Sequence, residues 1–200
     1  MERRRVKQKR AGNLHSYRRP RFPVCRGKRE DMREIFERRS TRKYQDRPVE
    51  PEKIRLILQA GMCAPSAGNE KPWHFVVVEE REELIKLSKL HPHAAMLPEA
   101  AFAVILCADP SLQKYRFDFW IQDCSAAAEN MLLAAEHLGI GAVWLGVYPN
   151  EERIKTMRPV FDIPDEIEIF CLLSFGYPEF KKTAKDRWDG SRVHNGRWNQ

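Results

Sequence analysis

Three segments of the 200-residue chain gather residue types that ligand binding would use. The first is Arg38-Arg39-Ser40-Thr41-Arg42, which places three guanidinium groups and two hydroxyls within five residues. Arginine binds phosphate through paired hydrogen bonds and hydroxyls add donors, so this segment predicts a phosphate-binding site. A solvated basic turn would have the same composition, and that alternative stays open at this stage.

The other two segments are rich in small residues. Residues 65–73 read Pro-Ser-Ala-Gly-Asn-Glu-Lys-Pro-Trp, and residues 139–146 read Gly-Ile-Gly-Ala-Val-Trp-Leu-Gly. Small residues let the backbone approach a flat ligand, and the Asn69 amide offers both a donor and an acceptor. Gly146 gives a second place where backbone could meet a ligand, although any helix–strand connection fits residues 139–146 equally well.

No arrangement of nucleophile, base or metal ligands stands out, and we predict no catalytic side chain. The chain lacks a P-loop, G-x-S-x-G, H-E-x-x-H and G-x-G-x-x-G. His91-Pro92-His93 has no nearby cysteine or acidic cluster, so it predicts a surface loop and no metal site. Four other polar residues have structural interpretations: His74 as an ordinary strand residue, Cys63 as a packing residue, and Asp123 and Glu129 as solvated or paired carboxylates.

Helices and strands must position these segments. Apolar residues recur at helical spacing after Pro51, which suits a first helical position. Gly139 is suited to end the longest helix and Asn150 to cap the next one. Strands that alternate with helices indicate a mixed sheet covered by helices. The predicted helices are 32–38 (Ile35 and Phe36 inward), 51–61, 81–90, 117–138 and 151–157, and the predicted strands are 75–78, 102–107, 142–147 and 168–175.

The positive charge of the chain is concentrated at its N-terminus. Of a formal net charge of +7, residues 1–31 hold twelve Lys or Arg and three Asp or Glu, and the other residues hold 23 basic and 25 acidic side chains. We expect residues 1–31 to be a poorly ordered basic tail and residues 32–200 to be the folded domain. The tail is interpreted as a polyanion-binding or nucleic-acid-binding arm, a solvated extension, or the result of a start codon placed before the true one at Met32.

Hydropathy and cysteine content limit the class of protein. With 42% apolar residues the chain can bury a core, but its longest apolar run is too short to span a bilayer as a helix. No apolar stretch follows the basic N-terminus, so no secretory signal is expected. The five cysteines are scattered without a C-x-x-C pair, which favours reduced thiols in a cytoplasmic protein.

In their order and spacing, the strings RRSTRKY, APSAGNEKPWHFVVV, HLGIGAVWLG and SFGYP, followed by KDRW and RVHNGRW, resemble the nitroreductase family of FMN-dependent NAD(P)H oxidoreductases. The resemblance runs from about residue 32 to residue 198. It implies an α+β three-layer sandwich, with a mostly antiparallel sheet flanked by helices. It also implies an intertwined homodimer with two FMN sites at the subunit interface.

The resemblance also implies roles for individual residues. Arg38, Arg39 and Ser40 would hold the phosphate and ribityl side of FMN, and Lys185 and Arg187 would reach the phosphate. The remaining predicted contacts surround the ring: Arg42 near the N1/C2 carbonyl edge, Pro65, Ser66, Ala67 and Asn69 beside the flavin with Asn69 hydrogen-bonding it, and the backbone of Leu145 and Gly146 by the N5 side. Two departures concern Lys71, where many relatives carry glutamine, and the short connection after Pro92, which leaves little chain for a lid.

The implied reaction is carried by the cofactor. NADH or NADPH would give hydride to flavin N5 and leave, and an electron-poor acceptor such as a nitroaromatic or quinone would take its place, which gives ping-pong kinetics. A cation such as Arg42 near N1 would stabilise the reduced flavin. Two alternatives stay open: reductive dehalogenation or flavin fragmentation on the same fold, and polyanion binding through residues 1–31.

Overall fold

The computed structural model describes residues 32–180 and 183–198. The predicted basic tail, residues 1–31, lies outside the described residues. Within the described part no helix is both long enough and apolar enough to cross a membrane.

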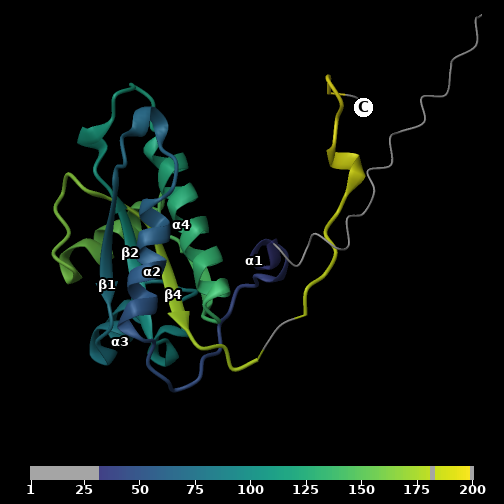
Figure 1. Cartoon of the computed structure of the whole chain (residues 1–200). Coiled ribbons are helices and arrows are strands. Elements are labelled where there is room, and N and C mark those ends of the chain that lie inside the picture. Colours follow the sequence, from purple (N-terminus) through teal and green to yellow (C-terminus); the bar gives the residue numbers. More distant parts are fainter. Residues whose placement is uncertain (1–31, 181–182, 199–200) are drawn as a thin grey trace, which may run out of the picture.

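Four antiparallel strands form the sheet in the order β1-β2-β4-β3 (Figure 1). They are β1 (Trp73–Val78), β2 (Phe102–Ala108), β3 (Gly141–Gly146) and β4 (Glu168–Gly176). The mixed sheet expected from the alternation of helices and strands is therefore wrong, and the mostly antiparallel sheet implied by the resemblance is confirmed. The cause is visible between β1 and β2, where the helical connection leaves and re-enters the same end of the sheet, since Val78 pairs with Ala103.

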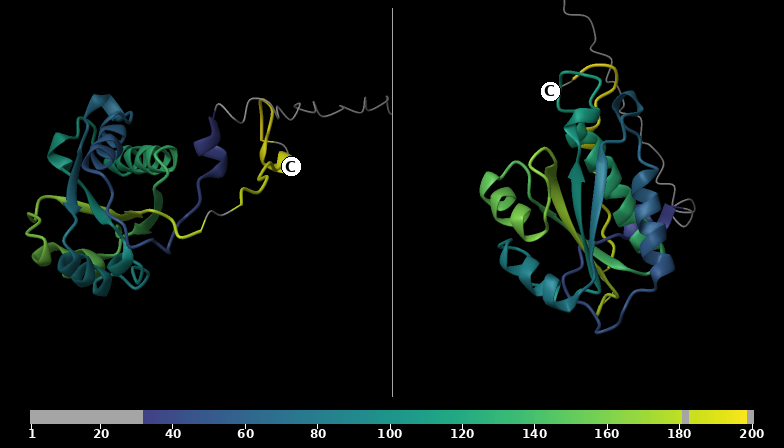
Figure 2. Two further views of the ribbon diagram at one scale, coloured as in Figure 1. Left: turned by 60° about the horizontal axis from the view of Figure 1, so that its bottom comes forward. Right: turned by 90° about the vertical axis from the view of Figure 1, so that its left-hand side faces the viewer.

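Helices cover both faces of the sheet and give the predicted three layers (Figure 2). On one face lie α2 (Pro51–Met62) and α4 (Trp120–His137), and on the other lie α3 (Arg81–Lys89) and α5 (Glu151–Met157). Helix α1 (Arg33–Glu37) stands beside the end of α4. Five short 3-10 helices complete the described chain: η3 (Ala67–Asn69), η4 (Leu97–Glu99), η5 (Pro110–Leu112), η6 (Arg158–Val160) and η7 (Gly190–Arg192).

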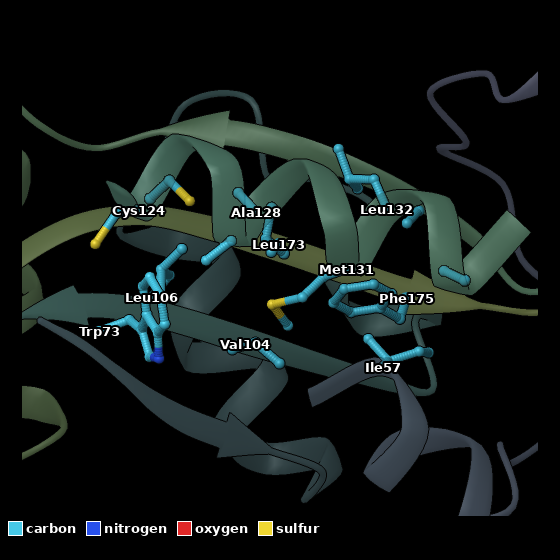
Figure 3. Close-up of a cluster of buried hydrophobic side chains, with 14 of the residues drawn as sticks. Ile57, Trp73, Val104, Leu106, Cys124, Ala128, Met131, Leu132, Leu173 and Phe175 are labelled. Carbon is cyan, nitrogen blue, oxygen red and sulfur yellow. The ribbon is translucent and has the colours of Figure 1, made fainter. Parts of the chain in front are cut away.

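The core on the α2/α4 side is built from alternate strand residues and the inner faces of both helices (Figure 3). Met131 of α4 lies over Phe175 of β4, whose ring stacks on Phe102 at a centroid distance of 4.6 Å. A Cβ at Gly61 would lie 2.9 Å from Met131, so a glycine there lets α2 approach α4 closely. This glycine therefore permits the close packing of α2 on α4.

The helix boundaries follow local chemistry as expected, but one prediction about helix packing is wrong. Pro51 opens α2, the Asn150 side chain accepts a hydrogen bond from the Arg153 amide at 3.0 Å, and Gly139 has a φ of +74° just after α4. The wrong prediction is the inward burial expected for α1. Ile35 is 59% exposed and Phe36 is 37% exposed, because α1 stands away from the sheet instead of packing on it.

The cysteines divide into buried and exposed thiols. Cys107, Cys124 and Cys171 are buried, and burial raises the pKa of Cys107 and of Cys124 to about 12. Cys63 is exposed at the end of α2, so its predicted packing role is wrong.

Candidate functional site

Two of the three predicted segments meet along β3, the edge strand. Residues 38–42 run beside the start of β3, where Ser40 forms a parallel bridge with Ala142 and the Thr41 amide donates to the Ala142 carbonyl at 2.9 Å. Gly146 ends the same strand. Six strand residues span about 17 Å, so β3 separates a basic end from a small-residue end.

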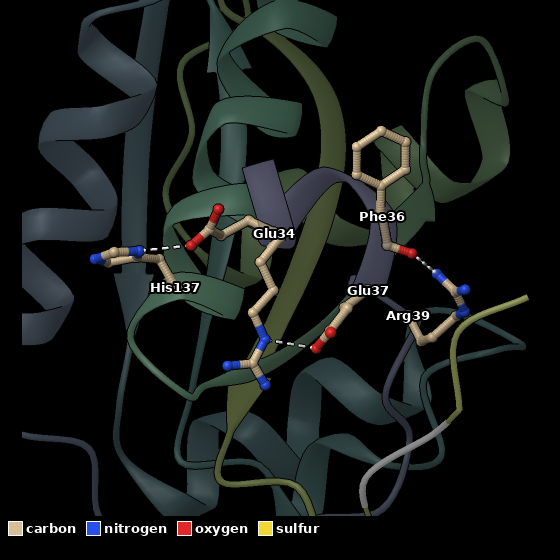
Figure 4. Close-up of polar contacts among 6 residues, drawn as sticks. Glu34, Phe36, Glu37, Arg39 and His137 are labelled. Atoms are coloured by element: carbon tan, nitrogen blue, oxygen red, sulfur yellow. Dashed lines mark hydrogen bonds and ion pairs between the residues drawn. The ribbon is translucent and has the colours of Figure 1, made fainter. Parts of the chain in front are cut away.

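A cavity of about 340 Å³ lies at the basic end. The Arg39 guanidinium donates through Nη1 to the carbonyls of Phe36 at 3.0 Å and Arg38 at 2.6 Å (Figure 4). Its Nη2 is buried and has no hydrogen-bond partner among the described residues. A buried guanidinium donor without an acceptor fits an anion. Arg39 shares the cavity wall with Arg33, Glu34, Glu37, Thr41, Glu136, His137, Gly139, Ile140, Gly141, Pro178 and Phe180.

Two of the carboxylates in this wall already have cationic or hydrogen-bonding partners (Figure 4). His137 Nδ1 lies 2.7 Å from Glu34 Oε1, and this hydrogen bond is the main reason that the pKa of Glu34 is lowered. Arg33 donates to Glu37 at 2.7 Å. Neither carboxylate therefore needs Arg39 to balance its charge.

The other two arginines of the segment point elsewhere. Arg38 forms an ion pair with Glu129 of α4 at 3.5 Å, so the expectation of a paired Glu129 is confirmed. Arg42 is exposed and lines a second cavity of about 340 Å³ together with His93 and Met96. The segment thus offers positive charge in two directions from the edge of β3.

At the far end of β3, the backbone of Gly146 faces open space. A Cβ built on Gly146 would meet no heavy atom within 4 Å. Trp144 and Gly146 alternate with Leu145, which is buried in the core on the α3/α5 side, so the open position lies on the α4 side of the sheet. A flat ligand could therefore approach this backbone closely.

Two side chains that the sequence analysis did not select hold the Gly146 carbonyl. His91 Nε2 lies 2.9 Å from this oxygen, and Arg153 Nη1 donates to it at 2.7 Å. His91 is only 3% exposed, so the prediction of a surface loop at residues 91–93 is wrong for this residue. No motif marks either residue, because both reach Gly146 through tertiary packing. His74, by contrast, is an exposed residue of β1, as expected.

The third predicted segment forms a strained loop before β1. Gly68, Asn69 and Lys71 have φ values of +53°, +58° and +52°. Such values are uncommon outside glycine and cost of order 1–3 kcal/mol at a residue like lysine. The Lys71 amide donates to Ser66 Oγ at 3.0 Å, which helps to hold this conformation. Strain of this kind concentrates at functional sites, which supports the choice of this loop as part of the candidate site.

Buried carboxylates fix the loop to its neighbours. Asp123 of α4 accepts a hydrogen bond from the Ala67 amide at 2.9 Å, and Glu70 accepts one from the Lys114 amide at 2.5 Å. Burial is the main cause of the raised pKa of Asp123, and the nearby Glu70 charge adds to it. Asp123 was expected to be solvated or paired; it is a buried carboxylate hydrogen-bonded to a backbone amide, so the solvated alternative is wrong. One further oxygen on each carboxylate, and Oε1 of Gln113, is buried without a partner in the described part of the chain.

One chain does not bring all the predicted residues together. The loop at 65–71 comes just before β1, at one edge of the sheet. Residues 38–42 lie beside β3, and Gly146 ends β3, at the opposite edge. Three strand spacings, about 14 Å, separate these edges, and α2 and α4 lie over the face between them. Lys185 and Arg187 are exposed on the C-terminal segment, which extends away from the sheet (Figure 2). No group of three or more potential metal ligands occurs within residues 32–180 and 183–198.

The antiparallel sheet between two layers of helices makes this an α+β protein. The model of the nitroreductase family matches residues 35–104 and 90–177, and the chain belongs to this family.

Known proteins similar to the chain agree with this assignment. The chain is 52% identical over 172 residues to an Archaeoglobus fulgidus protein named "Putative NADH dehydrogenase/NAD(P)H nitroreductase", covering 84% of this chain and 99% of the relative. It is 25% identical to the FMN reductase [NAD(P)H] of Bacillus subtilis, with 83% and 73% of the two chains covered. An FMN-dependent nitroreductase structure from Clostridium difficile has a TM-score of 0.77 at 33% identity, with 82% and 98% covered.

Proposed function

We propose that this protein is an FMN oxidoreductase that takes hydride from NADH or NADPH and passes it to electron-poor acceptors such as nitroaromatics or quinones. The observation that carries the proposal is the bare backbone of Gly146, which faces open space at a strand edge that also presents arginines. The names of the relatives support the same activity, since they include an FMN reductase and an FMN-dependent nitroreductase.

The residues at the two ends of β3 fit the two ends of FMN. A phosphate needs buried, unused donors, and Arg39 Nη2 is one. A flat ring needs backbone without side chains, and Gly146 supplies it. When bound, FMN supplies the two-electron redox chemistry that no side chain provides.

Within this proposal, each basic residue has a separate task. Arg39, with Arg38 and Ser40, holds the phosphate and ribityl side. Lys185 and Arg187 add positive charge to the phosphate from the C-terminal segment. Arg42 would lie toward the N1/C2 carbonyl edge, where a fixed cation would favour the extra negative charge of a reduced ring.

We further propose that the site is completed by a second copy of the chain. The strained loop carries the predicted ring contacts Pro65, Ser66, Ala67 and Asn69, but it lies at the edge of the sheet opposite to Gly146. A two-fold homodimer in which the loop of each chain lies against the Gly146 backbone of the other would join the two half-sites. The exposed C-terminal segment is then free to reach over the partner.

Complementation between two defective variants tests both parts of the proposal. Arg39→Ala impairs the half-site on β3, and Asn69→Ala impairs the half-site on the loop. We expect each homodimer to bind FMN weakly, whereas the mixed dimer recovers one site of wild-type affinity, because one of its two sites receives only intact segments. Differently tagged chains, purified as the mixed dimer and titrated with FMN, give the measurement.

The outcomes separate a shared site from a site within one chain. If each chain builds its own site, both sites of the mixed dimer remain impaired and no high-affinity binding returns. Acceptor profiling of the wild type then tests the reaction: oxidation of NADH or NADPH with a halogenated aromatic only, and never with a nitro compound or quinone, would favour the dehalogenase alternative.

A further inference from the structure

We propose that His91 is a positioning residue: together with Arg153, it holds the Gly146 carbonyl and so fixes the backbone that receives the flavin ring. This inference rests on the proposed function for its link to flavin, and on the geometry around Gly146 for the rest. His91 lies on the connection between α3 and η4, and Arg153 lies in the first turn of α5, so two elements beneath the sheet converge on one carbonyl.

The hydrogen bonds of His91 settle which ring nitrogen carries the proton. The His93 amide donates to His91 Nδ1 at 3.2 Å, and an amide N–H can only donate, so Nδ1 must be the unprotonated nitrogen. The Gly146 carbonyl can only accept, so Nε2 must carry the hydrogen. His91 is therefore held as the neutral Nε2–H tautomer. Burial is the main cause of the lowered pKa of His91, which keeps the ring neutral.

The charged and titratable groups around this ring agree with that state. Among the described residues, Arg153 of α5 and His93, which follows His91 in the connection between α3 and η4, act electrostatically on the His91 ring. Both disfavour a second proton on it. The Gly146 carbonyl of β3 faces the ring from the third side. A proton on Nδ1 would oppose the His93 amide, and the contact would be lost.

Gly146 is the residue of β3 that most needs an external constraint. A glycine has no side chain to limit its backbone rotation, and this one closes an edge strand. Its carbonyl takes two donors, which fill both lone pairs, and the amide of the next residue, Val147, donates to Phe170 at 3.3 Å. The Gly146–Val147 peptide is thus fixed on its oxygen side and on its nitrogen side.

The amide of Gly146 belongs to the preceding peptide, Leu145–Gly146, and strand geometry gives its direction. Ala142 uses the outer edge of β3, where its carbonyl accepts from Thr41. The backbone N–H and C=O of alternate strand residues point toward the same edge of the strand, and Gly146 is two such steps from Ala142. Both the N–H and the carbonyl of Gly146 therefore point toward the outer edge of β3. The result is a backbone donor at the open edge, beside the position where a Cβ would meet no atom. A ring placed there would meet this donor, and it would also pack against the Gly146 backbone whose carbonyl His91 and Arg153 hold in place.

Three substitutions separate positioning from folding. His91→Leu removes the donor and keeps an apolar side chain, and His91→Gln restores an N–H near the place of Nε2. His74→Gln, on the exposed face of β1, is the matched control. In the FMN-loaded protein, we expect His91→Leu to slow flavin reduction at saturating NADH or NADPH about 10-fold, because one buried hydrogen bond is lost. We expect His91→Gln to recover most of the rate and His74→Gln to leave it unchanged.

A second readout does not depend on flavin. Side-chain ¹⁵N NMR of the cofactor-free protein should show His91 neutral and protonated at Nε2, and the backbone amide signals of Gly146 and Val147 should broaden or move in His91→Leu but not in His74→Gln. A wild type that never binds FMN would refute the proposed function, and the NMR result would still decide the role of His91. Unchanged Gly146 signals, or wild-type reduction rates in His91→Leu, would overturn the positioning role.

Discussion

Substitution of Gly146 by alanine separates ligand binding from folding. A Cβ at this position would meet nothing within 4 Å, and the backbone is outside the left-handed region, so the folded protein has room for it. The free energy of unfolding should stay the same or rise by about 0.4–1 kcal/mol, because alanine restricts the unfolded chain. A ring packed against this backbone would instead be displaced by the new methyl group. Overpacking of this size costs about 1–3 kcal/mol, which weakens the dissociation constant for FMN about 5- to 150-fold.

Fluorescence titration with FMN gives the affinity, and urea unfolding of the cofactor-free protein gives the stability. Gly141→Ala is the contrasting control on the same strand, because its Cβ would lie 2.7 Å from Thr41 side-chain atoms. That variant should lose about 1–3 kcal/mol of stability. If Gly146→Ala binds FMN with wild-type affinity while its stability is unchanged, the open position beside β3 is not where the ring lies.

Three further predictions test other parts of the site. Arg42→Ala should lower the flavin reduction potential by about 20 mV, because loss of an exposed cation is worth about 1 kcal/mol for a two-electron couple. Dye-equilibrium potentiometry measures the potential, and the FMN content of the purified variant shows whether occupancy is preserved. Arg38→Ala combined with Arg187→Ala should lower FMN occupancy of the purified protein, and normal occupancy would mean that the phosphate contacts are misplaced. Asp123→Asn should stabilise the protein more at neutral pH than near pH 4. The raised pKa of Asp123 means that the folded state binds its proton more tightly than the unfolded state. The contribution of this carboxyl to stability therefore falls as pH rises above the ordinary pKa of 3.8. Urea unfolding of both proteins at the two pH values gives the measurement, and an equal difference in unfolding free energy between variant and wild type at both would contradict a buried carboxylate.

The sequence predicted the helices and strands well because their signals are local. The helical spacing after Pro51, the cap at Asn150 and the glycine at position 139 each act within a few residues, and each is confirmed. Strand direction is different. Alternating helices and strands indicated a mixed sheet, but the chain between Val78 and Phe102 returns to the end of the sheet that it left, and local patterns do not encode that path.

The candidate site shows the same division between local and tertiary information. Arg39 and Gly146 were predicted from residue type, and the structure gives them a buried, unused donor and an open backbone position. His91 was predicted to lie in a surface loop, and its burial was missed because its partner is 55 positions away in the sequence. The inward packing predicted for Phe36 failed for a related reason, since the amphipathic pattern of α1 does not say whether the same chain covers it.

The absorbance spectrum of the purified protein tests the central claim most directly. The account predicts a yellow protein that releases FMN on denaturation, rebinds it with one FMN per chain, and loses its flavin absorbance when NADH or NADPH is added without oxygen. A colourless protein that remains free of flavin in excess FMN would contradict the claim that these separated half-sites hold that cofactor.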